Sequence, residues 1–153
     1  MKTVNYNKID WEKHRCETLV IFCMDFRIPG DKLREVLTAA FSGQEKIAPF
    51  DEIRIAGGAK AVTDKESRQT ALAGIQIAVY KHSIGRIIIV NHHDCGAYGG
   101  ISRFNGNETA ERDFHSAELK KAEKIVIDFL ASIGKSNITI NLAYLSATKL
   151  IPV

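Results

Sequence analysis

A histidine and a cysteine three residues apart, His92 and Cys95, are the residues of this sequence best suited to chemistry. They follow the run from Ile87 to Val90, four β-branched residues that predict a buried strand. Open α/β sheets keep their functional groups just beyond the carboxyl ends of such strands. A His-x-x-Cys pair also occurs by chance where a strand ends, so taken alone it leaves a metal site and an ordinary polar turn both open.

A second group of residues favours the metal site. Cys23, Asp25 and Arg27 follow an earlier apolar run. Cys23, His92 and Cys95 together offer two thiolates and one imidazole, a set that suits tetrahedral Zn²⁺ and leaves a fourth position for water, as in catalytic sites. Asp25, paired with Arg27, is expected to accept a hydrogen bond from that water or to move onto the zinc as a fourth ligand. The alternative for this Asp–Arg pair is a surface ion pair.

A framework of parallel strands is needed to bring these residues together. Strands that alternate with helices favour parallel pairing and right-handed crossovers. The 153 residues are therefore expected to form one α/β domain, 1–153, with a mostly parallel central β-sheet flanked by helices and an N-terminal arm over 1–17. Hydrophobic periodicity predicts strands at 18–22, 51–56, 86–90 and 138–144, and helices at about 31–41, 63–82 and 110–132.

The ends of these elements carry further signals. Asp31 and Thr109 are expected to cap the first and third helices. Residues 42–44 are expected to end the first helix, and residues 99–107 to form a loop. The polar and apolar alternation of the last strand indicates the edge of a sheet.

Composition and charge are those of an ordinary folded domain. The chain is 45% hydrophobic, its net charge is +3, and Lys and Arg are scattered, which disfavours nucleic acid as a partner. We find no signal peptide and no apolar run of ~20 residues, so a cytoplasmic protein with no membrane partner is expected. Three cysteines in a reducing compartment favour metal binding or catalysis over disulfides. Cys16 is interpreted as a small hydrophobe outside any site, and His14 and His82 as surface residues.

The sequence contains three blocks of residues that stand out together: Cys23-x-Asp25-x-Arg27, Arg54-x-Ala56-Gly57-Gly58 and His92-x-Asp94-Cys95-Gly96. Together these blocks resemble the signature of the β-class carbonic anhydrases. They stand in the order of that family, with compatible spacing, and they span residues 23–96. The short chain, its brief N-terminal arm and its segment after Cys95 depart from the family pattern, so the chain resembles a short, divergent member.

The resemblance implies a zinc lyase, a carbonic anhydrase (carbonate dehydratase) that reversibly hydrates CO₂ to bicarbonate. Cys23, His92 and Cys95 would hold Zn²⁺, with Asp25 and Arg27 as the gating and orienting pair. Zinc lowers the pKa of its bound water toward ~7, so zinc-bound hydroxide would be the nucleophile. The family also implies a homodimer or higher homo-oligomer with active sites near the subunit interface.

Residues beside these motifs are assigned supporting roles. Gly57 and Gly58 belong to the second block and are candidate site residues. Phe26, Ile28 and Tyr98 are candidates for a narrow apolar slot that holds CO₂, with ordinary core or turn packing as the alternative.

Two further histidines lie near the motifs in the sequence. His93 is expected to be a bystander and not a ligand, because adjacent residues on an extended chain face opposite sides. Glu111 and His115 lie four residues apart on one helix face. We interpret them as a solvated pair at a helix start, with a proton shuttle or a pair behind the ligands as the alternative.

Other functions fit the same residues. One is a non-catalytic zinc- or bicarbonate-binding module on the same fold. Another is a hydrolase of a related small substrate such as CS₂ or COS, which the width of the pocket would decide. A redox dithiol of Cys23 and Cys95 is the remaining alternative.

Overall fold

The protein is seen in a computed structural model that describes residues 3, 9–41 and 49–153. The described residues form a five-stranded sheet in the order β2-β1-β3-β4-β5, in which β5 is antiparallel to β4 and the other pairs are parallel. The predicted α/β domain with a mostly parallel sheet is therefore confirmed. The strands are β1 (Thr18–Phe22), β2 (Phe50–Arg54), β3 (Arg86–His92), β4 (Thr139–Leu145) and β5 (Leu150–Pro152).

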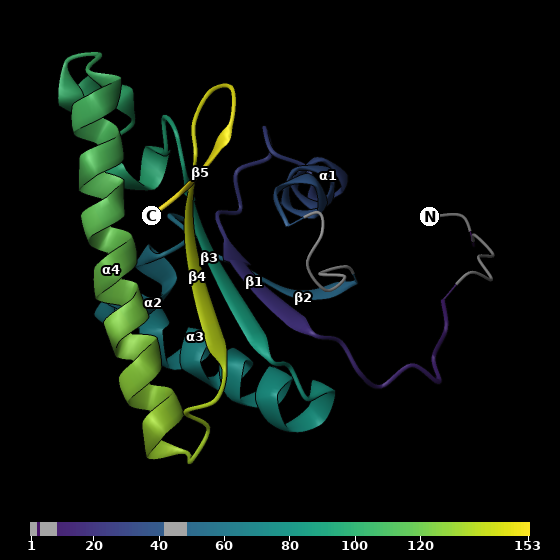
Figure 1. Ribbon diagram of the computed structural model, residues 1–153. Coiled ribbons are helices and arrows are strands. Elements are labelled where there is room, and N and C mark those ends of the chain that lie inside the picture. Colours follow the sequence, from purple (N-terminus) through teal and green to yellow (C-terminus); the bar gives the residue numbers. More distant parts are fainter. Residues whose placement is uncertain (1–2, 4–8, 42–48) are drawn as a thin grey trace.

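Helices cover both faces of this sheet (Figure 1). Helix α1 (Gly30–Ala40) lies on one face. The other face carries α2 (Lys60–Thr63), α3 (Lys65–Ile77), which continues as the π-helical turn η1 (Ala78–His82), and α4 (Glu108–Ser132). Two 3₁₀ turns, η2 (Gly96–Tyr98) and η3 (Ile101–Phe104), join β3 to α4.

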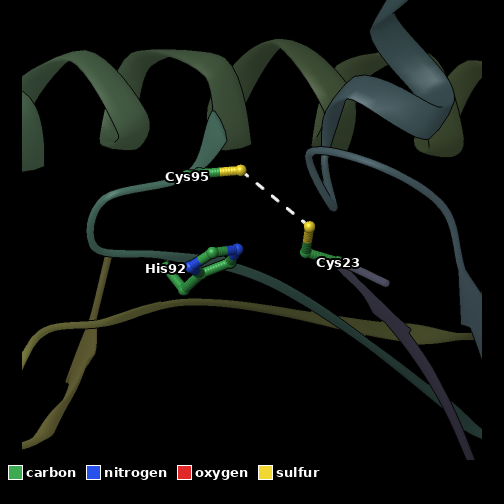
Figure 2. A group of neighbouring side chains, drawn as sticks. All are labelled: Cys23, His92 and Cys95. Atoms are coloured by element: carbon green, nitrogen blue, oxygen red, sulfur yellow. Dashed lines mark hydrogen bonds between the residues drawn. The ribbon is translucent and has the colours of Figure 1, made fainter. Parts of the chain in front are cut away.

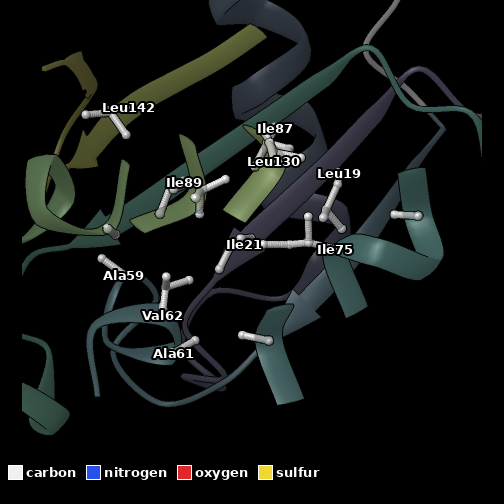
Figure 3. Close-up of a cluster of buried hydrophobic side chains, with 14 of the residues drawn as sticks. Leu19, Ile21, Ala59, Ala61, Val62, Ile75, Ile87, Ile89, Leu130 and Leu142 are labelled. Atoms are coloured by element: carbon white, nitrogen blue, oxygen red, sulfur yellow. The ribbon is translucent and has the colours of Figure 1, made fainter. Parts of the chain in front are cut away.

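The central strands are apolar throughout because both of their faces are buried. In β1, Leu19 and Ile21 face α3 and α4, while Val20 and Phe22 face α1. Side chains alternate along a strand, so a strand covered on both sides reads as a continuous apolar run. Figure 3 shows the buried cluster on the face covered by α3 and α4, in which Ile75 of α3 and Leu130 of α4 pack over the sheet.

Several predicted boundaries are wrong by a few residues. Strand β3 runs to His92, because Asn91 and His92 continue its ladder with β4. Helix α1 starts at Gly30 with Pro29 at its N-cap, which puts Asp31 in the first turn. Helix α4 is capped by Asn107, whose side chain accepts a hydrogen bond from the Ala110 amide at 3.0 Å. Thr109 lies one residue inside that helix and cannot cap it.

Strand β4 is not the edge of the sheet. The short strand β5 pairs with it on its outer side, so the prediction of an edge at 138–144 is wrong. A strand of three residues that ends in Pro152 has too few residues to show a period. The predicted helix end at 42–44 lies outside the described residues. None of the described helices combines the length and the apolar character needed to cross a membrane.

Candidate metal centre

The predicted ligands meet at the carboxyl end of the sheet. Cys23 follows β1, His92 ends β3, and Cys95 lies on the turn after β3. Strands β1 and β3 are parallel neighbours, so their carboxyl ends lie side by side. Figure 2 shows the three side chains turned toward one another. The two sulfurs are 3.9 Å apart, and the three potential ligand atoms all lie within 4.8 Å of one another.

This arrangement fits a zinc ion. Two thiolates on a tetrahedral zinc stand roughly 3.8 Å apart, given Zn–S bonds of ~2.3 Å, which agrees with the 3.9 Å between these sulfurs. His92 Nδ1 lies 2.8 Å from the carbonyl of His93 and must donate to it, which leaves Nε2 with its lone pair free. His92 Nε2 is buried and has no hydrogen-bond partner among the described residues. An imidazole nitrogen with a free lone pair, placed beside two buried thiols, offers the three donor atoms that a zinc ion requires from the protein.

The hydrogen bond between the two sulfurs favours ionisation of one of them. The hydrogen bond from Cys95 lowers the pKa of Cys23 to about 4, against the opposing effect of burial. The same hydrogen bond, together with burial, raises the pKa of Cys95. Burial opposes protonation of His92, but the nearby Cys23 sulfur and the hydrogen bond to the His93 carbonyl raise its pKa. Without a metal, Cys23 and Cys95 therefore share one proton. A bound divalent cation would allow both sulfurs to ionise.

The middle block of the sequence motif holds Cys23 in place. The Gly57 amide donates a hydrogen bond to Cys23 Sγ at 3.2 Å. The Arg54 guanidinium donates to the carbonyls of Cys23 and Ile28, at 3.2 and 2.6 Å from Nη2. Gly58 has a φ of +56°, and a Cβ there would meet the Val90 carbonyl oxygen at 2.4 Å. These two glycines let the backbone approach the sulfur and β3 more closely than any side chain would permit.

Asp25 and Arg27 form a pair beside the ligands. Arg27 donates to Asp25 from Nε at 3.0 Å and from Nη2 at 2.6 Å, and also to the Asp94 side chain from Nη1 at 2.8 Å. These bonds lower the pKa of Asp25 to about 2, so its carboxylate stays ionised. Asp25 Oδ2 lies 3.9 Å from His92 Nε2. The pair is made within a turn, because the Ile28 amide bonds back to the Asp25 carbonyl and the strand pleat does not persist past β1.

His93 lies outside the ligand set, as expected. Its Nδ1 is 2.7 Å from Glu111 Oε2, and it does not belong to the group of potential ligands at Cys23, His92 and Cys95. Glu111 Oε1 also accepts a hydrogen bond from the Asp94 amide at 2.8 Å, and Oε2 accepts one from the Tyr144 hydroxyl at 2.9 Å. Glu111 is fully buried, so it anchors the turn that connects His92 to Cys95.

The interpretation of Glu111 and His115 as a solvated pair is wrong. Both side chains are fully buried, because Tyr144 of β4 covers them. Burial lowers the pKa of His115 to about 4, so its ring is neutral near pH 7 and unsuited to shuttling protons there. Asn91 fixes the ring, since its amide oxygen accepts from the Ala59 amide and its nitrogen faces His115 Nδ1 at 3.1 Å. Asn91 and Tyr144 were missed in the sequence because nothing marks them as polar groups inside a core.

The three predicted slot residues separate in the structure. Tyr98 packs against Cys23 and Cys95, and its buried hydroxyl has no partner among the described residues. Ile28 packs with the α1 side of the core and also lines the pocket beside His92. Phe26 is 90% exposed in this chain, so it lines no slot within it. A pocket of about 680 Å³ lies next to His92 and is walled by Arg27, α1 and the segment that joins β4 to β5.

Comparison with known proteins gives consistent matches. A family model described as "Putative carbonic anhydrase" matches residues 13–143. An uncharacterised protein of Rickettsia bellii is 31% identical over 120 residues, which cover 74% of this chain and 69% of that protein. A carbonic anhydrase structure from Streptococcus mutans matches 92% of this chain and 83% of its own, with a TM-score of 0.59 and 17% identity. Tetrameric β-carbonic anhydrases from Sordaria macrospora match 92% of this chain and 81% of theirs, with a TM-score of 0.57 and 17% identity.

Proposed function

Because this chain belongs to the carbonic anhydrase family, as a short and divergent member of the β class, we propose that it is a zinc enzyme that reversibly hydrates CO₂ to bicarbonate. One observation carries the proposal: two buried thiols 3.9 Å apart face a buried imidazole nitrogen that has no partner in the described structure. Cys23, His92 and Cys95 would hold the zinc. When bound, zinc would supply a Lewis acid that makes water ionise near neutral pH.

Asp25 and Arg27 would orient the reacting water. Asp25 stays ionised, because Arg27 lowers its pKa to about 2, and it can accept a hydrogen bond from a water molecule that shares the site. Such a bond would keep a lone pair of that water directed at the carbon of CO₂. Arg27 is held by both Asp25 and Asp94, so the acceptor is fixed in direction before substrate arrives.

Stopped-flow CO₂ hydration and metal analysis on one zinc-loaded sample test this function. We expect about one tightly held zinc per chain at this centre and hydration well above the buffer rate at alkaline pH. Cys23→Ser should remove both, whereas Ser at Cys16, far from the centre, should leave hydration unchanged. A zinc-loaded wild type that hydrates CO₂ no faster than buffer would contradict the proposal.

A second candidate keeps the zinc but not the turnover. The pocket beside His92 measures about 680 Å³, a size that suits ligands far larger than a three-atom substrate. Such a pocket has room for bicarbonate or a bulkier anion, so the second candidate is a module that binds zinc and such an anion without catalysis. It predicts that bicarbonate raises the melting temperature in a sample with no hydration activity. Parallel assays with CO₂, COS and CS₂ on that sample separate this module from a hydrolase of a related substrate.

We also propose a cytoplasmic homodimer or higher homo-oligomer. Two large apolar side chains flank Asp25 and are exposed in the single chain: Phe26 at 90% and Met24 at 64%. Exposed apolar groups next to a site mark surfaces that associate. Sedimentation analysis should show at least a dimer, and Phe26→Glu should shift it toward the monomer. Wild-type chain that sediments as a monomer at high concentration would argue against the assembly.

A further inference from the structure

Three more potential ligands meet at the opposite, amino-terminal edge of the sheet. Cys16 precedes β1, Asp51 lies at the start of β2, and His82 ends the helix that precedes β3. Strands β2, β1 and β3 are parallel neighbours, so their amino ends adjoin. The sulfur, one carboxylate oxygen and one ring nitrogen all lie within 4.8 Å of one another. Cys16, interpreted from the sequence as a small hydrophobe outside any site, therefore lies beside a carboxylate and an imidazole.

Main-chain hydrogen bonds fasten two of these residues together. The Cys16 amide donates to the His82 carbonyl at 3.2 Å. The next carbonyl, that of Glu17, accepts from the amides of Gly85 and Arg86 at 3.0 and 3.1 Å. The segment before β1 and the segment before β3 are thus joined at three points, so the positions of the thiol and the imidazole are fixed by the fold.

Sheet register brings in the third residue. Asp51 of β2 pairs with Leu19 of β1, and neighbours in register point to the same face of a parallel sheet. Leu19 faces the side covered by α3 and η1, and His82 is the last residue of η1. The carboxylate therefore points at the end of that helix, where Asp51 Oδ2 reaches His82 Nδ1 at 2.6 Å.

The spacing is close to that of a metal site. Ligand atoms on a tetrahedral zinc stand roughly 3.3–3.8 Å apart, given bonds of ~2.0–2.3 Å. The Asp51–His82 distance is shorter than this because a proton bridges the two atoms, and a metal would replace that proton. Cys16 Sγ is only weakly engaged, with the Thr18 carbonyl at 3.6 Å.

The donor set selects the class of metal. Sulfur, nitrogen and oxygen donors together suit Zn²⁺ and similar transition metals, while Mg²⁺ and Ca²⁺ favour all-oxygen sites. The side chains of His82 and Asp51 are 42% and 29% exposed, which leaves a path for entry and room for water as a fourth ligand. We propose that Cys16, Asp51 and His82 form a second site for a divalent transition metal, independent of the centre at Cys23, His92 and Cys95.

The cysteine count allows a clean test with Co²⁺ as the probe. The chain has three cysteines, so the variant Cys23→Ser/Cys95→Ser keeps Cys16 as its only thiol. Co²⁺ bound to a thiolate absorbs in the near ultraviolet by charge transfer. In this variant we expect that band to appear with about one Co²⁺ per chain. It should vanish when Cys16→Ser is added.

Further substitutions show whether the three residues act together. Asp51→Asn and His82→Gln should each weaken Co²⁺ binding at least about 10-fold in that background, and His14→Gln, at an exposed histidine, should not. Absence of the band, or a band that neither substitution changes, overturns the proposal of a second site.

If the double variant fails to fold, metal analysis of the intact chain tests the proposal instead. Cys16→Ser should lower the saturating metal content from about two ions per chain to about one. An unchanged metal content would overturn the proposal. None of these experiments measures CO₂ hydration. A negative result would therefore contradict the second metal site without bearing on the proposed hydration of CO₂.

Discussion

Strands β1 and β3 carry a potential metal site at each end, and the two ends hold their ligands differently. At the carboxyl end the ligands are two buried sulfurs and a buried imidazole nitrogen that lacks a partner. At the amino end they are one sulfur, one carboxylate and one imidazole, and the carboxylate and imidazole already share a half-exposed hydrogen bond. A cation at the carboxyl end would therefore pair an otherwise unpaired nitrogen. A cation at the amino end would have to replace an existing hydrogen bond.

The difference lies in what surrounds each set. The carboxyl-end turn is fixed by the buried Glu111, by Arg54 and by two glycines that admit the backbone. The amino-end residues are held by main-chain bonds and by the half-exposed contact between Asp51 and His82. Removal of water strengthens every charge interaction inside a site. We therefore expect tight metal binding and chemistry at the carboxyl end, and weaker, exchangeable metal binding at the amino end.

Cys23→Ser should have the largest effect. It removes one thiolate from the carboxyl-end set, so affinity for zinc there should fall by at least about 100-fold and hydration should be lost. Chelator competition and stopped-flow assays measure the two effects. Cys16→Ser is the matched control, because it removes the thiol of the other end. Equal loss of hydration in both variants would contradict the prediction that only the carboxyl end carries the catalytic zinc.

Asp25→Asn should act on catalysis and spare the metal. The amide keeps the size of the side chain but loses the charge that Arg27 holds, so kcat/KM should fall by about 100-fold or more at unchanged zinc content. Steady-state kinetics and metal analysis on one preparation separate the two effects. A variant that loses its zinc would make Asp25 a metal-holding residue and not an orienting one.

Glu111→Ala should lower both the folding stability and the zinc affinity of the carboxyl end, because Glu111 holds the turn between two of the ligands. The Asp94 amide, the Tyr144 hydroxyl and His93 would all lose a buried partner, which costs about 3 kcal/mol of folding free energy. Zinc affinity should fall about 10-fold or more, because Asp94 lies between two ligands. Denaturant unfolding and chelator competition measure these changes. Asp128→Ala, at an exposed position of the same helix, should change neither.

The pH dependence of stability should report on His115, behind the carboxyl end. Its pKa is lowered from 6.5 to about 4 by burial, so the unfolded chain takes up this proton first as the pH falls. Stability should therefore drop between about pH 6.5 and pH 4, by up to about 3 kcal/mol from this group. Unfolding of metal-free protein at several pH values tests this, and His115→Phe should flatten the slope. A wild-type slope unchanged by that substitution would assign the loss to other groups.

The carboxyl end could be predicted from the sequence because its signals are local. Cys23 and His92 each follow a run of apolar residues that marks a strand, and parallel strands bring such ends together. The role of Glu111 could not be predicted, because a glutamate in the first turn of a helix is normally exposed. Here Tyr144, from a strand more than thirty residues later, covers it.

The amino end left no signal in the sequence. Cys16, Asp51 and His82 belong to three segments with no motif spacing among them. Their approach depends on the register of β1 against β2 and on the residue at which the helix before β3 ends. Both are set by packing of the whole sheet, and predicted element ends are uncertain by several residues.

His82→Gln in the metal-free protein should have the smallest effect, and it sharpens the contrast most directly. The substitution removes a half-exposed ion pair with Asp51, and such pairs contribute about 0–1 kcal/mol. With saturating Zn²⁺, however, the chain that keeps His82 should gain stability that the His82→Gln variant lacks, since a metal stabilises the fold only where it binds. Thermal unfolding with and without Zn²⁺ measures the gap, in the Cys23→Ser/Cys95→Ser background so that the other end contributes nothing. A gap that is the same with and without zinc would mean that the amino end holds an ion pair and no metal.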